Sequence, residues 1–133
     1  MAVAGREPVI ARDVGGRVAR AWLRRSRFAD VAALARATLS LGPDASALYH
    51  LGFAQSSTGQ PWQALTSYQQ ALNLDPRNDR ALTGLAGIYE KLGRPDRALA
   101  LYERALEVKH DQPEVQARVK ELRGRGVSGP HPD

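Results

Sequence analysis

The sequence contains no cysteine among its 133 residues. This absence excludes a disulfide framework, a thiolate metal cluster and a cysteine nucleophile. The three histidines do not stand at metal-ligand spacing from one another. Glycine-rich phosphate-binding motifs and the G-x-S-x-G motif of serine hydrolases are also missing. We therefore expect a protein that is not an enzyme and that needs no cofactor or metal.

Long apolar runs are absent as well. No segment approaches the ~20 residues that cross a bilayer, because arginines such as Arg36 interrupt the best candidate. The first residues, MAVAGREPVIARD, lack the unbroken apolar region and small-residue cleavage site of a secretory signal. We expect no membrane insertion and a cytoplasmic location.

Charge is scarce in the middle of the chain. The formal net charge is +5, and residues 1–36 hold eight arginines against three acidic residues, whereas residues 37–75 hold only Asp44 and Asp75. A sequence pI of about 10.1 favours polyanions, so nucleic-acid binding through the basic first third is one alternative. Nucleic acid is disfavoured as a partner because the aromatic residues do not alternate with the arginines as stacking platforms would.

What the sequence does contain is an internal repeat. An offset of 34 residues aligns GQPWQALTSYQQAL with GRPDRALALYERAL, so that Ala64 matches Ala98 and Tyr68 matches Tyr102. A weaker first copy lies 33 residues earlier. Its second half places Val31, Ala35 and Leu39 on Ala64, Tyr68 and Leu72, and its first half places Val18, Ala19 and Trp22 on Leu51, Gly52 and Gln55. Matches at one period indicate a structural repeat.

Each copy has the pattern of two helices. In the second copy one helical face collects Leu48, Leu51, Gly52 and Gln55, and the next segment repeats this spacing with Ala64, Leu65, Tyr68, Ala71 and Leu72. Between them, Gly59 can adopt the left-handed conformation that ends a helix, and Pro61 suits the first turn of the next. The pattern predicts an all-α superhelix of about seven helices. The expected parts are a flexible tail 1–11, a repeat domain 12–123 (repeats 12–44, 45–78 and 79–112, then a capping helix 113–123) and a flexible tail 124–133.

These repeats resemble the tetratricopeptide repeat family. The second copy carries L-x2-L-G and then Ala64, Tyr68, Ala71 and Pro76, close to the family pattern W-x2-L-G-x2-Y…A-x3-F…P. Departures are the leucine in place of the opening tryptophan, Gln55 in place of the tyrosine, and His110 in place of the last proline of the third copy. The resemblance implies a non-catalytic adaptor or scaffold that binds an extended peptide or a helix of another protein in a concave groove.

The resemblance also indicates which residues of this chain stand at the positions that line the groove in the family. Carried over by position, they include Tyr49, His50, Phe53, Arg80, Thr83 and Gly87, together with Arg17, Arg20 and Arg24 from the first copy. Tyr49 and Phe53 are one turn apart and would form a pocket for an apolar anchor; alternatively, Phe53 packs between helices. The three arginines share one helical face and would orient an acidic segment, or they form only a solvated face.

Two subclasses and one further alternative follow from the resemblance. Co-chaperones that clamp a carboxylate use a defined Lys, Asn and Arg set, whose positions here hold Gly16, Arg20, His50, Arg80 and Gly84, of which only Arg80 fits in kind. The layout is also similar to chaperones of type III secretion translocators, which hold an apolar client segment in the groove. Self-association through the exposed end of the repeat stack is the further alternative.

Overall fold

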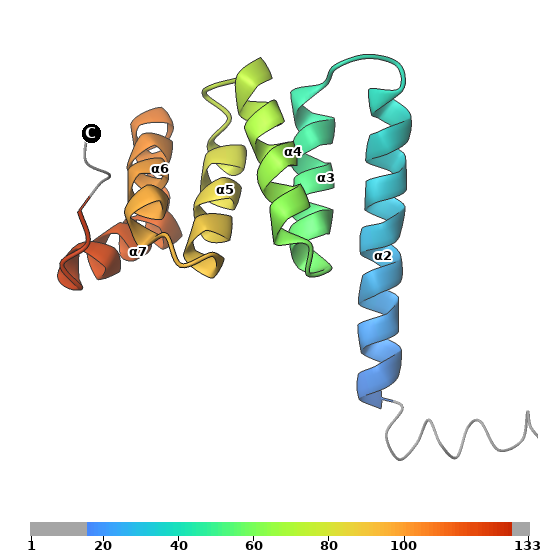
Figure 1. Ribbon diagram of the computed structural model, residues 1–133, viewed down its shortest axis with the longest axis horizontal. Helices are drawn as coiled ribbons and strands as arrows, with labels where there is room; N and C mark the ends of the chain where they lie inside the picture. Colours follow the sequence, from blue (N-terminus) through green and yellow to red (C-terminus); the bar gives the residue numbers. More distant parts are fainter. Residues whose placement is uncertain (1–15, 129–133) are drawn as a thin grey trace, which may run out of the picture.

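The computed structural model describes the backbone of residues 16–128 and the side chains of residues 24–128. Within this range the chain forms six helices and no strand: α2 (Gly16–Leu39), α3 (Ala45–Ser57), α4 (Pro61–Leu74), α5 (Asp79–Lys91), α6 (Pro95–Val108) and α7 (Pro113–Gly124). The helices α2 to α6 run alternately up and down beside one another (Figure 1). This confirms the all-α superhelix. No described helix has the length and apolar character required to span a membrane.

The second and third copies fold as helical hairpins, as predicted. The side chains of Asp44 and Asn78 start α3 and α5 by accepting hydrogen bonds from the backbone N–H groups of Ala47 (2.8 Å) and Ala81 (3.0 Å). Gly59 and Gly93, with φ of 78° and 75°, make the turns inside the two hairpins. Each turn is followed by a proline in the first turn of the next helix.

The first copy corrects the prediction, because it is one continuous helix and not a hairpin. Helix α2 runs through the position of the expected turn, where Ser26, Arg27 and Phe28 stand in place of Gly59, Gln60 and Pro61. None of these three residues favours a left-handed turn or interrupts a helix, and the surrounding arginine, alanine and leucine residues are good helix formers. The described chain therefore has six helices instead of about seven. The amino-terminal part of α2 extends well past the end of α3 (Figure 1).

The ring of Tyr68 fills the space between the two hairpins. Its side chain is 2% exposed, and the ring lies between Gly52 of α3 and Gly84 of α5. A Cβ atom added at Gly52 would lie 3.0 Å from Tyr68 Cδ1, and one added at Gly84 would lie 2.6 Å from Tyr68 Cζ. Burial, and to a lesser extent the neighbouring Tyr49, raises the pKa of Tyr68 above its ordinary range. The two glycines therefore set how closely three helices approach one aromatic ring.

Helix α7 covers the last hairpin as a capping helix. Its buried residues, Val115, Val119 and Leu122, form one stripe along the helix. The chain after α7 differs from the expected flexible tail 124–133, because Gly126 has a φ of 83° and the N–H of Val127 donates to the carbonyl of Leu122 at 3.1 Å. Val127 then packs against the core. Residues 124–128 thus close the helix, and the rest of that expected tail, like the tail 1–11, lies outside the described residues.

Candidate functional site

An aromatic pair, Tyr49 and Phe53, lies on α3 as predicted. The two rings are stacked with centroids 6.3 Å apart and an interplanar angle of 29°. Tyr49 is half-buried, and its ring also lies next to that of Tyr68, with the two ring centroids 6.0 Å apart. Phe53 is 45% exposed, and its ring meets Phe28 of α2 edge-on at 5.9 Å. The aromatic pair is therefore fixed to the core on one side and open to solvent on the other.

Phe28 lies next to the aromatic pair but was not predicted from the sequence. It stands at the repeat position of Pro61, where a turn was expected. Because α2 continues through this position, Phe28 is carried on a regular helix to the edge of Phe53. The first copy has no glycine or proline at the positions of Gly59 and Pro61, and this absence could have predicted a continuous helix that includes Phe28.

The other residues at the predicted groove positions differ in their surroundings. A Cβ atom at Gly87 would meet no atom within 4 Å, so this residue faces open space, whereas Gly84 contacts the aromatic core. Thr83 donates its hydroxyl to the carbonyl of Arg80 at 3.0 Å, and Arg80 itself is exposed. His50 is exposed beside Tyr49, with ring centroids 5.2 Å apart.

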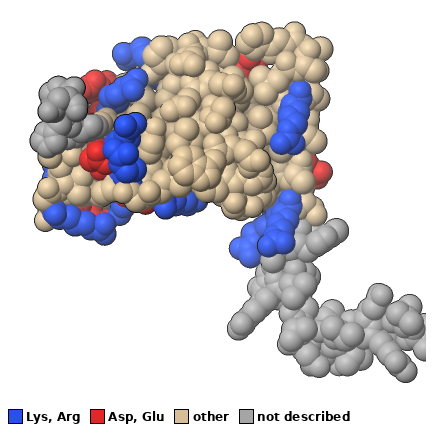
Figure 2. All heavy atoms as spheres, viewed as in Figure 1, with Lys and Arg blue, Asp and Glu red and all other residues tan. Residues whose placement is uncertain are grey.

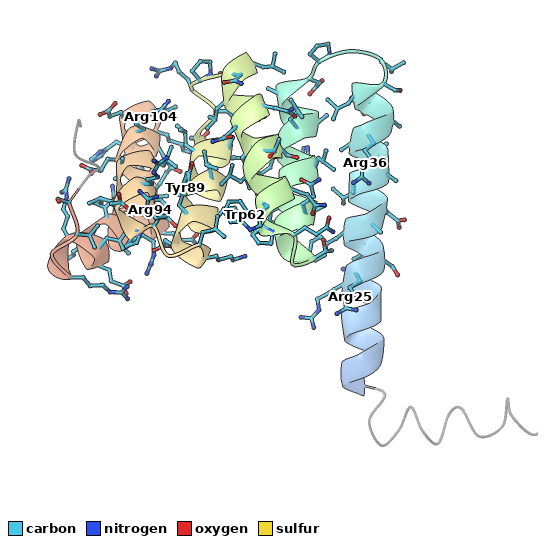
Figure 3. All side chains as sticks on the ribbon, viewed as in Figure 1. Arg25, Arg36, Trp62, Tyr89, Arg94 and Arg104 are labelled. Atoms are coloured by element: carbon cyan, nitrogen blue, oxygen red, sulfur yellow. The ribbon has the colours of Figure 1, made fainter. Side chains whose placement is uncertain are left out.

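The predicted arginine stripe lies on the part of α2 that extends past α3. Arg24 is exposed there, while the side chains of Arg17 and Arg20 lie outside the described residues. Figure 3 places Arg25 on the same extension and Arg36 beside α3. Among the side chains that the structure describes, no arginine of α2 forms an ion pair. The described arginines of α2 thus give this end exposed positive charge that no described carboxylate pairs with.

Charge is distributed unevenly along the superhelix. The hairpin of α3 and α4 contains no charged residue, and Figure 2 shows an almost uncharged middle with charged side chains gathered toward the two ends. The carboxyl-terminal end carries charges of both signs, and several of them form ion pairs: Arg118 with Glu90 and Glu121, Arg125 with Glu121, and Arg123 with Glu103. The aromatic pair thus occupies a neutral surface between a basic end and an end that carries charges of both signs.

A polar cluster connects α5, α6 and α7 at this carboxyl-terminal end. The hydroxyl of Tyr102 donates to Glu90 Oε2 at 2.9 Å, and Arg118 forms an ion pair with the other oxygen of Glu90. Burial, followed by this hydrogen bond, raises the pKa of Tyr102 to about 12. Next to the cluster is an open hollow of about 570 Å³, lined by residues that include Thr83, Tyr102, Glu114 and Arg118. No group of His, Asp and Glu in the described part of the chain could hold a metal ion.

We expect Glu90→Gln to lower the free energy of unfolding by about 1 kcal/mol. The substitution removes the ion pair with Arg118 and weakens the hydrogen bond from Tyr102, whose hydroxyl is then less well satisfied. Glu103→Gln is the matched control, because the Glu103 and Arg123 side chains are 38% and 61% exposed and such pairs contribute under about 1 kcal/mol. Chemical denaturation of both variants measures the difference, and equal losses would show that the cluster adds nothing beyond a surface pair.

Comparisons with known proteins place these features in a family. The sequence profile of the tetratricopeptide repeat matches residues 56–122. A curated relative, the photosystem I assembly protein Ycf3 of Rippkaea orientalis, is 40% identical over 67 residues, which are 45% of this chain and 39% of the relative. This chain therefore spans well under half of that relative's length.

Solved structures show the same architecture. The type III secretion translocator chaperone SycD of Yersinia enterocolitica superposes with a TM-score of 0.70 at 19% identity, covering 83% of this chain and 89% of that one. PcrH in complex with the chaperone binding region of PopD gives a TM-score of 0.61 at 25% identity, covering 75% and 76%. With the repeat profile matched over half of its length and its hairpins arranged as in these structures, the chain belongs to the tetratricopeptide repeat family.

Proposed function

We propose that the protein is a non-catalytic adaptor that binds a segment of another protein on the surface of the aromatic pair. The observation that carries this proposal is the exposure of Phe53. This large aromatic side chain is 45% exposed on a hairpin whose two helices contain no charged residue. Exposed aromatics on a rigid helix are typical anchors of protein interfaces. No charged group on α3 or α4 would have to be dehydrated when a partner covers them.

The surroundings of Phe53 hold its ring in place before a partner binds. Contacts with Tyr49 and Phe28 restrict its rotamers, so less side-chain entropy is lost on association. Tyr49 is less suited to be the anchor, because it is half-buried and also supports Tyr68. The partner would supply an apolar side chain to Phe53, and acidic residues on its amino-terminal or carboxyl-terminal side would meet Arg24.

A narrower candidate function is a chaperone for a secretion translocator or a similar client. The support for it is the likeness to PcrH, a structure whose partner is the chaperone binding region of PopD. A client segment of that kind would use the same aromatic pair. Identification of the bound protein separates this role from that of a general adaptor.

We expect Phe53→Ala to weaken partner binding by about tenfold, because it removes most of one apolar contact. Leu74→Ala is the matched control: Leu74 is 50% exposed but lies at the end of α4, away from the aromatic pair. Proteins that co-purify with each form from native lysate are identified by mass spectrometry, and the affinity of each purified candidate is then measured. Circular dichroism establishes that both variants are as helical as the wild type.

Three outcomes would contradict the proposal. If Phe53→Ala retains the same proteins with the same affinity, the aromatic pair is structural. If the wild type retains nucleic acid with a steep salt dependence, the basic amino-terminal third is the binding surface. If neither form retains any macromolecule except further copies of the chain, self-association is the function to pursue.

A further inference from the structure

A second open surface lies between α2 and α3. We call it the α2–α3 groove, a hollow of about 320 Å³ lined by Val31, Leu34, Ala35, Thr38, Asp44, Ser46, Ala47 and His50. Leu34 is 71% exposed, which is unusual for a leucine in the middle of a helix that packs against a neighbour. The groove does not include the aromatic pair, because neither Tyr49 nor Phe53 lines it; His50, which does line it, is its neighbour on that side.

Equivalent positions elsewhere in the chain are covered by a helix. The repeat counterparts of Leu34 are Ser67 and Leu101, which are 5% and 8% exposed. Ser67 donates its hydroxyl to Gln55 of α3 at 2.6 Å, so α3 covers that position in its own hairpin. Leu101 is buried in the same way on α6, the helix that packs against α5 in the last hairpin. In each complete hairpin, the counterpart of Leu34 is therefore buried on a helix that packs against the first helix of that hairpin.

The α2–α3 groove is open because its hairpin does not form. The described part of the segment that matches the missing first helix, residues 16–25, is helical, continues α2 without a turn and extends past the end of α3 (Figure 1). Val31, at the repeat position of the fully buried Ala64 and Ala98, is left half-buried as a result. The groove is thus a hollow between two helices with Val31, Leu34 and Ala35 as its apolar wall on α2, a surface that could receive the apolar face of a helix.

We propose that the α2–α3 groove binds an amphipathic helix of a partner protein, antiparallel to α2, whose carboxyl-terminal end is followed by acidic residues. The orientation comes from the two complete hairpins, in which the first helix ends next to the start of the second. A helix placed in the same way ends near Arg27. The chain that follows it then passes Arg24.

The charges on α2 support the acidic flank. Arg27, Val31, Leu34 and Thr38 follow at i, i+4, i+7 and i+11, and so share one face of α2. The apolar groove therefore continues directly into Arg27 and Arg24, which are exposed and form no ion pair with any described residue. Arginine pairs well with carboxylates, and both cations would also lie near the negative end of the bound helix dipole.

The same arrangement argues against a second copy as the occupant. A symmetric contact between two antiparallel α2 helices would use the same face of both. The arginines that continue this face in one copy would then lie against the apolar Leu34 region of the other. An apolar groove does not compensate the dehydration of such charges.

A labelled peptide tests the proposal. The probe is ASALYHLGFAQSS, the sequence of α3 that fills the equivalent groove beside α4, followed by a short run of glutamates; a control peptide ends in lysines. Fluorescence anisotropy measures binding to the full chain.

We expect Leu34→Gln to weaken binding of the peptide about tenfold. We expect Leu41→Gln to leave binding unchanged, because Leu41 is 90% exposed but lies outside the groove. We expect the glutamate peptide to bind more tightly than the lysine peptide, and Arg24→Gln/Arg27→Gln to abolish this difference.

Each other result overturns the proposal. Absence of saturable binding, or equal binding by Leu34→Gln and wild type, would show that the groove does not accept a helix. Peptide binding that Phe53→Ala weakens but Leu34→Gln does not would place the peptide on the aromatic pair, which supports the proposed function and rejects this one. A wild-type dimer in light scattering that Leu34→Gln converts to a monomer would make a second copy the occupant. Thermal melts of the variants check that all are folded.

Discussion

Gly84→Ala is expected to lower the free energy of unfolding by about 2 kcal/mol, whereas Gly87→Ala, further along the same helix, is expected to raise it by about 1 kcal/mol. A Cβ at Gly84 would lie 2.6 Å from Tyr68 Cζ, and the ring cannot move away because Gly52 already lies close on its other side. At Gly87 the added methyl group meets nothing within 4 Å. There, only the better helix propensity of alanine remains.

The pair is measured by urea denaturation followed by circular dichroism. Both substitutions add the same group to the same helix, so propensity cancels and the difference reports the contact with Tyr68. A double variant, Gly84→Ala/Tyr68→Leu, should show a smaller loss than the sum of its single variants, because the clash is removed. A neutral Gly84→Ala would mean that α5 moves freely away from α4. A Gly87→Ala variant that loses as much as Gly84→Ala would show that the loss does not come from the contact with Tyr68.

The positions of the two complete hairpins were predictable because local signals and long-range pattern agree there. Gly59 and Pro61 mark a turn, and the residues on either side have apolar faces that match. In the first copy these signals disagree. Val18, Ala19 and Trp22 have the apolar spacing of a first helix, but Ser26 and Phe28 supply no turn. The apolar pattern says which residues can be buried if two helices pair, while the turn decides whether they pair.

In the candidate site, too, some features could be predicted from local sequence and others could not. The contact between Tyr49 and Phe53 follows from their spacing on one helix and needs no tertiary information. The exposure of Leu34 depends on a helix that does not fold back, and the role of Gly84 depends on where Tyr68 of another helix lies. Such facts arise from contacts between segments far apart in sequence. A single sequence with an imperfect first repeat does not specify them.

Leu82→Ala is expected to lower the free energy of unfolding by about 3 kcal/mol, the largest loss anticipated for a single substitution in this chain. Leu82 is 0% exposed on α5, the helix that packs against both α4 and α6. Truncation leaves a cavity between the two hairpins that neither can fill without losing contact with the other. Leu74→Ala, at a side chain 50% exposed, should cost less than about 1 kcal/mol.

The consequence reaches beyond stability, because each unit of a repeat protein contacts only its neighbours. A loss of about 3 kcal/mol is a large fraction of the 5–15 kcal/mol that holds a typical domain folded. Weakening α5 uncouples the hairpin that carries the aromatic pair from the α5–α6 hairpin and its capping helix. Leu82→Ala should therefore also broaden the urea transition, or divide it into two steps, while Leu74→Ala keeps one transition of wild-type slope. A single transition of unchanged slope in Leu82→Ala would instead show that all six described helices unfold as one cooperative unit, so that Phe53 and the α2–α3 groove are lost together with the capping helix.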